Sequence, residues 1–126
     1  MSDVCVGEMT NGSRIVTARP IDLAHLARMT LGDLSLEREV LQLFERQAGM
    51  LLGRVRGGSP PAIAAIAHTL KGSARGIGAK RVASAAEAVE AASSAGDEAM
   101  LDDAIARLRE AADEARAVIA ELLRAG

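Results

Sequence analysis

The sequence has almost no aromatic residues. Its 126 residues include one phenylalanine, Phe44, and neither tyrosine nor tryptophan. β-Sandwiches and barrels draw on aromatic and β-branched side chains, and platforms for single-stranded nucleic acid stack bases on aromatic rings. The composition therefore argues against an all-β fold, catalysis by tyrosine and sites built on stacked aromatics. We expect no nucleic-acid partner.

Cysteine and long apolar runs are also scarce. The single cysteine, Cys5, cannot form an internal disulfide, which excludes a disulfide-stapled secreted scaffold. No apolar run reaches the ~20 residues of a membrane span. Residues 1–11 lack the basic start and apolar stretch of a signal peptide. We therefore expect a cytoplasmic protein that does not associate with membranes.

Alanine is abundant instead, together with leucine, arginine and glutamate, which all favour helices. Apolar residues make up 49% of the chain, charged residues 25%, and the net charge is −2. These values are typical of a globular protein, and the length suits a single domain. The composition as a whole predicts an all-α fold.

The apolar spacing predicts a short helix and four longer ones. Residues 1–19 show no sustained period and are expected to form a flexible N-terminal arm, which leaves 20–126 as the folded domain. Pro20 is expected to open the short helix and Gly32 to end it. Three of the longer helices are expected after caps at Asp33 or Ser35, at Ser59 and at Asp97, and the other is expected from about Ala79 to Ser93. Gly76 and Gly78 should end or kink the third of the five.

Short turns between these helices favour an antiparallel up-and-down four-helix bundle with a short extra N-terminal helix. A long coiled-coil dimer is the competing assembly. The glycines and prolines at 57–61 favour a chain that folds back on itself. We therefore expect a monomer whose last helix, with apolar residues from Leu101 to Leu122, faces the other helices.

His68 is the residue most suggestive of chemistry. At ~100° per residue, it lies opposite the apolar stripe of its helix and is therefore expected to be exposed. The side chains within about 60° of it are small or basic, namely Ala64, Ala65, Lys71, Gly72 and Arg75. A neutral imidazole is a nucleophile, small neighbours let a partner approach, and the cations can offset phosphoryl charge. The pattern indicates a phosphoryl-accepting site, although an exposed histidine can also be an ordinary solvated residue.

The segment around His68 resembles the motif of histidine-containing phosphotransfer (HPt) domains. That motif has histidine, any residue, an apolar residue, lysine, glycine and a small hydroxyl residue, with Gly-Ala following. The chain carries His68-Thr69-Leu70-Lys71-Gly72-Ser73 and then Gly78-Ala79. Gly32-Asp33, Glu39-Val40-Leu41 and Phe44 are similar to the preceding helix of that family. The resemblance spans about residues 20–123.

The resemblance implies a four-helix bundle that carries a phosphoryl group on His68 between receiver-domain aspartates in a phosphorelay. It also implies that Lys71 stabilises the phosphoryl charge, that Ser73 supports ring orientation or packing, and that Gly72 lets the partner dock. Ala64, Ala65 and Arg75 complete the expected docking face. Arg75 and Gly76 depart from the family pattern and leave the length of that face open.

The implied partners are response-regulator receiver domains, with the receiver of a hybrid histidine kinase as one candidate. Such receivers bring their own Mg²⁺, so we expect no cofactor or metal in this chain. No kinase domain follows His68, so another protein would phosphorylate it. The basic residues Lys71, Arg75, Lys80 and Arg81 would complement an acidic receiver.

The sequence is also compatible with other interpretations. A non-catalytic helical adaptor that uses the same alanine- and glycine-rich face is the main alternative. The glycines from Gly72 to Gly78 also match a dinucleotide-binding fingerprint, but they follow a predicted helix and not the required strand. His25 is expected to be solvated or half-buried. Glu87 and Glu90 are expected to lie on a charged, solvent-facing surface.

Overall fold

The computed structural model describes residues 20–125, so the predicted arm at 1–19 lies outside the described residues. Within the described range the chain forms helices and no strand. The helices are α2 (Leu23–Thr30), α3 (Leu34–Val55), α4 (Pro60–Ile77), α5 (Lys80–Ala95) and α6 (Glu98–Ala125). The predicted all-α fold is confirmed. No helix of the described part is long and apolar enough to cross a membrane.

Three of the predicted helix starts are confirmed by their caps. The carboxylate of Asp33 accepts a hydrogen bond from the Leu36 amide at the start of α3. The Ser59 hydroxyl accepts one from Ala62 at the start of α4, where Pro60 is the first helical residue. Asp97 accepts one from Met100 at the start of α6. Each cap satisfies an amide that has no partner within its helix.

The start of the first helix differs from the sequence prediction, and the predicted end of the α4 helix at Gly76 or Gly78 is confirmed at Gly78. Pro20 does not open α2, because Asp22 caps it by accepting from the His25 amide. α2 ends at Thr30, and Leu31 at φ 54° and the predicted Gly32 at φ 78° follow it in the left-handed region. α4 runs through Gly76 without ending, and Gly78 closes it at φ 78°.

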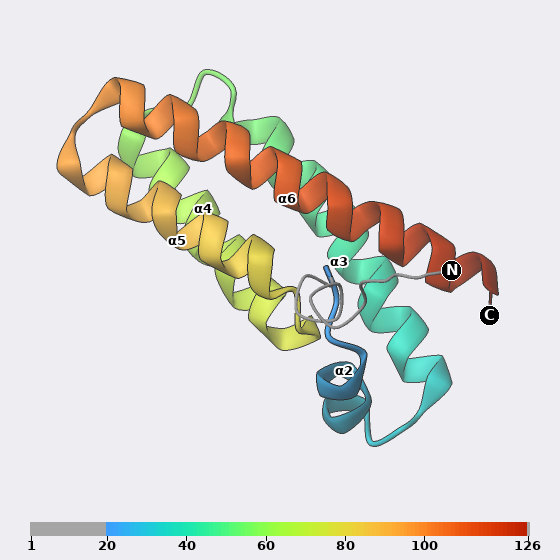
Figure 1. Cartoon of the computed structure of the whole chain (residues 1–126). Helices are drawn as coiled ribbons and strands as arrows, with labels where there is room; N and C mark the ends of the chain where they lie inside the picture. Colours follow the sequence, from blue (N-terminus) through green and yellow to red (C-terminus); the bar gives the residue numbers. More distant parts are fainter. Residues whose placement is uncertain (1–19, 126) are drawn as a thin grey trace, which may run out of the picture.

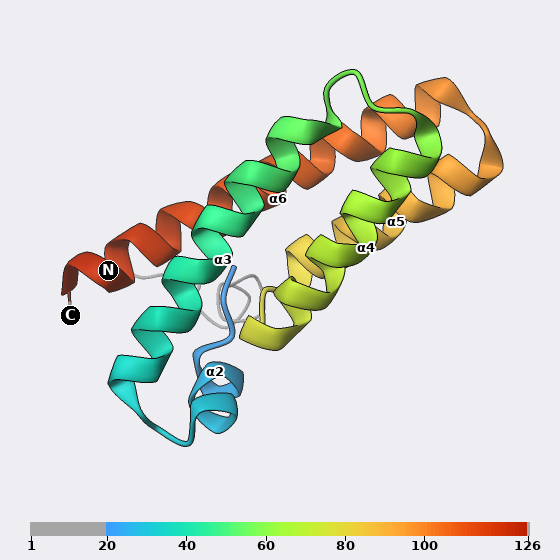
Figure 2. The ribbon, with the colours of Figure 1, turned by 180° about the vertical axis from the view of Figure 1, so that it is seen from behind.

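The four longer helices pack in pairs, as Figures 1 and 2 show from opposite sides. α4 packs against α5, α5 against α6, α6 against α3, and α3 against α4. Only two residues separate α4 from α5, and the two helices lie side by side in both views. α2 packs on α3 and α4 at one end.

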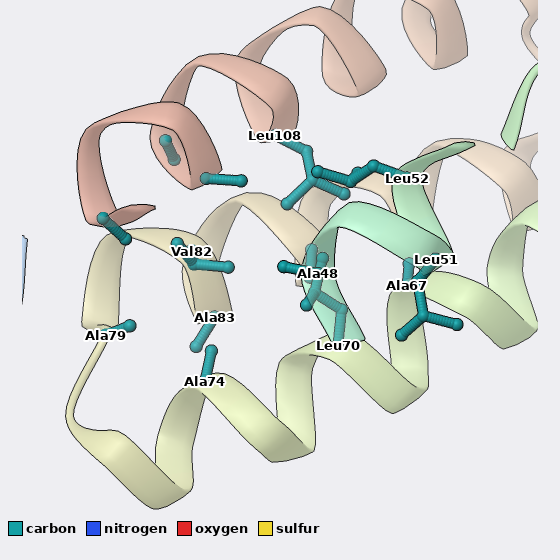
Figure 3. Close-up of a cluster of buried hydrophobic side chains, with 14 of the residues drawn as sticks. Ala48, Leu51, Leu52, Ala67, Leu70, Ala74, Ala79, Val82, Ala83 and Leu108 are labelled. Carbon is teal, nitrogen blue, oxygen red and sulfur yellow. The ribbon is translucent and has the colours of Figure 1, made fainter. Parts of the chain in front are cut away.

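Small side chains fill much of the core. Ala48 of α3, Ala67 and Ala74 of α4, and Ala83 of α5 lie among Leu70 and Leu108 in Figure 3. Because alanine projects only a methyl group, these helices can approach one another closely. The larger buried side chains include Phe44, Leu70 and Ile119. The last helix buries the predicted stripe Leu101, Leu108, Ala112, Ala115 and Ile119, while Ile105 and Leu122 are partly buried.

Candidate functional site around His68

His68 projects from α4 on the side opposite the core, as predicted. Ile63, Leu70 and Ala74 of the same helix are buried, whereas 71% of the His68 side chain is exposed to solvent. One edge of the imidazole therefore faces the medium from the middle of a helix. A ring in this position is accessible to another protein.

Glu90 of α5 lies against the imidazole. Its Oε2 atom is 3.0 Å from His68 Nδ1. Its other oxygen, Oε1, is 2.6 Å from Lys71 Nζ. One carboxylate thus bridges the histidine and the lysine across the α4–α5 interface. The sequence predicted Glu90 only as part of a charged surface; the side chain is 26% exposed and makes both of these contacts.

The contact with Glu90 covers and pairs the ammonium group of Lys71. Its side chain is 15% exposed, so the ammonium group is largely covered and paired. The hydrogen bond from Lys71 is the main cause that holds the pKa of Glu90 below its ordinary value, and the contact with His68 acts in the same direction. Desolvation opposes this effect. Glu90 is therefore ionised at neutral pH.

Small residues surround His68 on its own helix. Gly72 is exposed, and a Cβ added there would meet no atom of the described residues within 4 Å beyond the nearby helix backbone. Ala65 is exposed and Ala64 is half-buried. The surface of α4 around His68 therefore carries small side chains, as the sequence predicted. Whether a partner uses it remains a prediction.

Ser73 lies away from the imidazole. Its hydroxyl donates a hydrogen bond of 2.7 Å to Oε1 of Gln47 in α3. This bond joins α3 to α4 in a part-buried position. The structure therefore brings Lys71 to His68 through Glu90, while the described contact of Ser73 is with the neighbouring helix. The predicted support of ring orientation stays a prediction.

The predicted basic cluster is accompanied by carboxylates. Arg75 lies 3.7 Å from Glu87, Lys80 lies 3.3 Å from Asp22, and Arg81 lies 2.8 Å from Glu114. With the Lys71–Glu90 pair, each of the four predicted cations has an acidic neighbour. Their positive charge is consequently offset locally, and this surface carries alternating charges.

An apolar groove lies beside the His68 face, between α2, α3 and α4. Exposed side chains of Met29, Leu36 and Leu43 rim it. Ser73 and Gly76 contribute its α4 wall, and Gly76 lies one helical turn beyond Gly72. Gly72 and Gly76 therefore lie on successive turns of α4, and Gly76 also lines the groove.

Sequence reasoning missed Glu90 and the role of Gln47. The two-residue turn after α4 offered a signal for Glu90, because positions 68 and 89 are equally far from its centre. Gln47 falls within the apolar spacing of α3, where a polar residue indicates a hydrogen-bonded contact.

The described helices carry an exposed histidine that contacts a carboxylate. This arrangement is typical of a protein that offers an imidazole to a partner protein. The family model of the Hpt domain matches residues 39–118. This match covers more than half of the chain, and the protein belongs to the Hpt (histidine-containing phosphotransfer) domain family.

A solved structure agrees with this assignment at the level of the fold. The chain is similar to the crystal structure of a rice protein assigned as a histidine-containing phosphotransfer protein, with a TM-score of 0.76 and 18% sequence identity. The similarity covers 89% of this chain and 85% of the rice chain. A comparison with curated proteins gives no match.

Proposed function

We propose that the protein carries a phosphoryl group on His68 between the aspartates of receiver domains in a phosphorelay. Membership of the Hpt family supports a phosphorelay role. The observation that carries the proposal is the exposure of the His68 imidazole on an otherwise core-facing helix. A ring nitrogen attacks the phosphorus, the bond from phosphorus to the aspartyl oxygen breaks, and the aspartate leaves as a carboxylate.

Little covalent chemistry is asked of this chain, because phosphoryl transfer is catalysed mainly by positioning and charge compensation. The receiver supplies the acidic pocket and its Mg²⁺, and this chain supplies the nucleophile. Lys71 lies one helical turn from His68 and is the nearest cation on α4 able to meet the transferred group. Arg75, which is exposed and only loosely paired, is a second cation on the same face.

The receiver docks on the face formed by Ala64, Ala65, Gly72 and Arg75 and extends over the apolar groove between α2, α3 and α4. The bare surface supports close approach of the partner. The exposed apolar side chains of Met29, Leu36 and Leu43 support a contact that excludes water. Docking on both would bring the receiver aspartate to the exposed edge of His68.

The supporting architecture is an antiparallel up-and-down bundle of α3 to α6, with α2 as the short extra helix. The short connections and the pairwise packing of neighbouring helices support this arrangement. Such a bundle uses its apolar faces internally, which favours a monomer.

A transfer assay with phosphorylated receivers tests the proposal. We expect the wild-type chain to acquire a label that is labile in acid and stable in base, as a phosphohistidine is. The His68→Gln variant should acquire none, whereas His25→Gln, which removes the other histidine, should be labelled normally. Label that persists in His68→Gln would refute the site. Binding without label from any of a panel of receivers would favour the non-catalytic adaptor.

A further inference from the structure

A leucine-lined pocket lies where α2, the first turns of α3 and the last turns of α6 meet. This is the end of the molecule opposite the turn between α5 and α6, as Figures 1 and 2 show. The pocket has a volume of about 270 Å³, close to the lower end of the range for small-ligand sites. Six leucines line it, two from each helix: Leu23, Leu26, Leu34, Leu41, Leu122 and Leu123.

These leucines form an apolar floor and an exposed rim. Leu26 and Leu41 are buried, whereas Leu23 and Leu34 are exposed to solvent. The pair from α6 is partly buried against the core. An aliphatic chain lying in the pocket would cover the exposed leucines and remove its own surface from water, and both effects are favourable.

Arg38 adds one cationic side chain to the apolar walls. It lines the same pocket from α3, and its Nη1 atom is buried without a hydrogen-bond partner in the described part of the chain. Burying an N–H group of a charged side chain without an acceptor is costly, and such groups are rare in folded proteins. An anionic oxygen that entered the pocket would accept a hydrogen bond from Nη1 and offset this cost.

Glu37 is the other charged residue in the wall, and its carboxylate is directed to a different group. Its Oε2 atom accepts a hydrogen bond of 3.1 Å from the hydroxyl of Thr30, the buried last residue of α2. The negative charge of Glu37 lowers the positive potential of the pocket. It does not supply the acceptor for Arg38 Nη1.

We propose that this pocket binds a medium-chain monocarboxylate, an aliphatic acid anion of about eight carbons, which suits its small volume. The carboxylate accepts a hydrogen bond from Arg38 Nη1, and the chain lies over Leu26 and Leu41. A guanidinium presents its N–H groups in a fork that fits a carboxylate. A neutral alcohol of the same length matches the walls but not the cation, and a short anion matches the cation but not the walls.

The site goes beyond the phosphotransfer function. The residues that line it come from α2, α3 and α6, whereas His68 and the docking residues around it belong to α4. Binding in the pocket therefore needs neither a receiver domain nor a phosphoryl group. It can be measured on the whole chain by itself.

Titration of the full chain with octanoate near neutral pH tests the proposal, at concentrations at which octanoate does not aggregate. We expect octanoate to shift the carbon-13 methyl signals of Leu23, Leu34 and Leu122 and to raise Tm as its concentration increases. 1-Octanol should bind at least ~10-fold more weakly, because it cannot form the charge-assisted bond. Acetate, which has the carboxylate without the chain, should leave the leucine signals unchanged.

Variants of the two charged residues give effects of opposite sign. Arg38→Gln should weaken octanoate binding about tenfold and leave octanol binding unchanged. Glu37→Gln keeps an oxygen for Thr30 but removes a negative charge, so it should tighten octanoate binding. Arg46→Gln is the matched control, since Arg46 is an exposed arginine of the same helix that does not line this pocket. Its affinity for octanoate should equal that of the wild type.

Three results would overturn the proposal: no octanoate binding by the wild type, equal octanoate affinity in the wild type and a folded Arg38→Gln variant, or methyl shifts confined to leucines outside the pocket. Should Arg38→Gln fail to fold, the wild type decides, because equal affinities for octanoate and octanol would also overturn the proposal. Binding of an acidic amphipathic peptide in place of octanoate would assign the pocket to a protein partner and refute the small ligand.

Discussion

Replacing Gly72 by leucine should block phosphotransfer without harming the fold. Gly72 is exposed, and no atom of the described residues beyond the nearby helix backbone lies within 4 Å of an added Cβ. Its φ is not positive, so a side chain there meets no backbone strain. Bulk at this position enters only the space above α4, one helical turn from His68.

We expect Gly72→Leu to raise the free energy of unfolding and to lower the transfer rate. Glycine inside a helix is about 1 kcal/mol less favourable than alanine or leucine, so Gly72→Leu should raise the free energy of unfolding by up to that amount. A gain of about 1 kcal/mol corresponds to a rise in Tm of roughly 4 °C for a domain of this size. A side chain that holds the partner away should lower the transfer rate at least ~10-fold, equivalent to a loss of about 1.4 kcal/mol.

Gly53 provides the matched control. It too is an exposed glycine within a helix, α3, with none of the described residues near an added Cβ except its own helix backbone. Gly53→Leu should give the same gain in Tm and leave transfer from a phosphorylated receiver unchanged. Thermal unfolding and single-turnover transfer on both variants, with Gly72→Ala as an intermediate, complete the comparison. Normal transfer by a folded Gly72→Leu variant would refute the docking face.

Three further outcomes concern stability. The pKa of Glu90 lies below its ordinary 4.5 in the folded state, so the unfolded chain takes up this proton first. The stabilisation should be complete well above pH 4.5 and be lost as the pH falls through the folded pKa; urea unfolding from pH 7 to pH 3 should show less of this loss in Glu90→Gln. Gly78→Ala should destabilise by at least ~1 kcal/mol more than Gly32→Ala, since both residues have φ 78° but only at Gly78 would a Cβ lie 3.0 Å from Asp22. Equal losses in chemical denaturation would contradict this. Ser73→Ala should cost about 1 kcal/mol of unfolding free energy, because Gln47 loses its donor, and an unchanged Tm would show that the bond contributes nothing.

The local determinants of the helices could be predicted because each depends on a few neighbouring residues. The caps at Asp33, Ser59 and Asp97 are read from a side chain and the amide three residues ahead. The start of α2 could not be predicted in this way. Asp22, and not Pro20, caps the start of α2. The Asp22 amide also donates a hydrogen bond to the Gly78 carbonyl at the end of α4. That tertiary contact has no counterpart in the local sequence.

The exposed position of His68 was predictable for a similar reason, since one helix and its apolar stripe decide which way a side chain faces. The partner of the imidazole was not, because the contact joins residues 22 positions apart on two helices. Charge neighbours across helices depend on the relative rotation of α4 and α5. The same rotation pairs Lys71 with Glu90 and Arg75 with Glu87.

The ion pairs around His68 limit how much positive charge this chain can offer to a phosphoryl group. A phosphoryl group adds between about −1.5 and −2 charges. In the free protein the largely covered ammonium of Lys71 already faces Glu90, and Arg75 faces Glu87. Under the proposed function, and unless Lys71 turns away from Glu90, most of the compensation for the transferred group would come from the receiver. A site that attracts the phosphoryl group only weakly by itself releases it readily, which suits a carrier that has to pass the group in both directions.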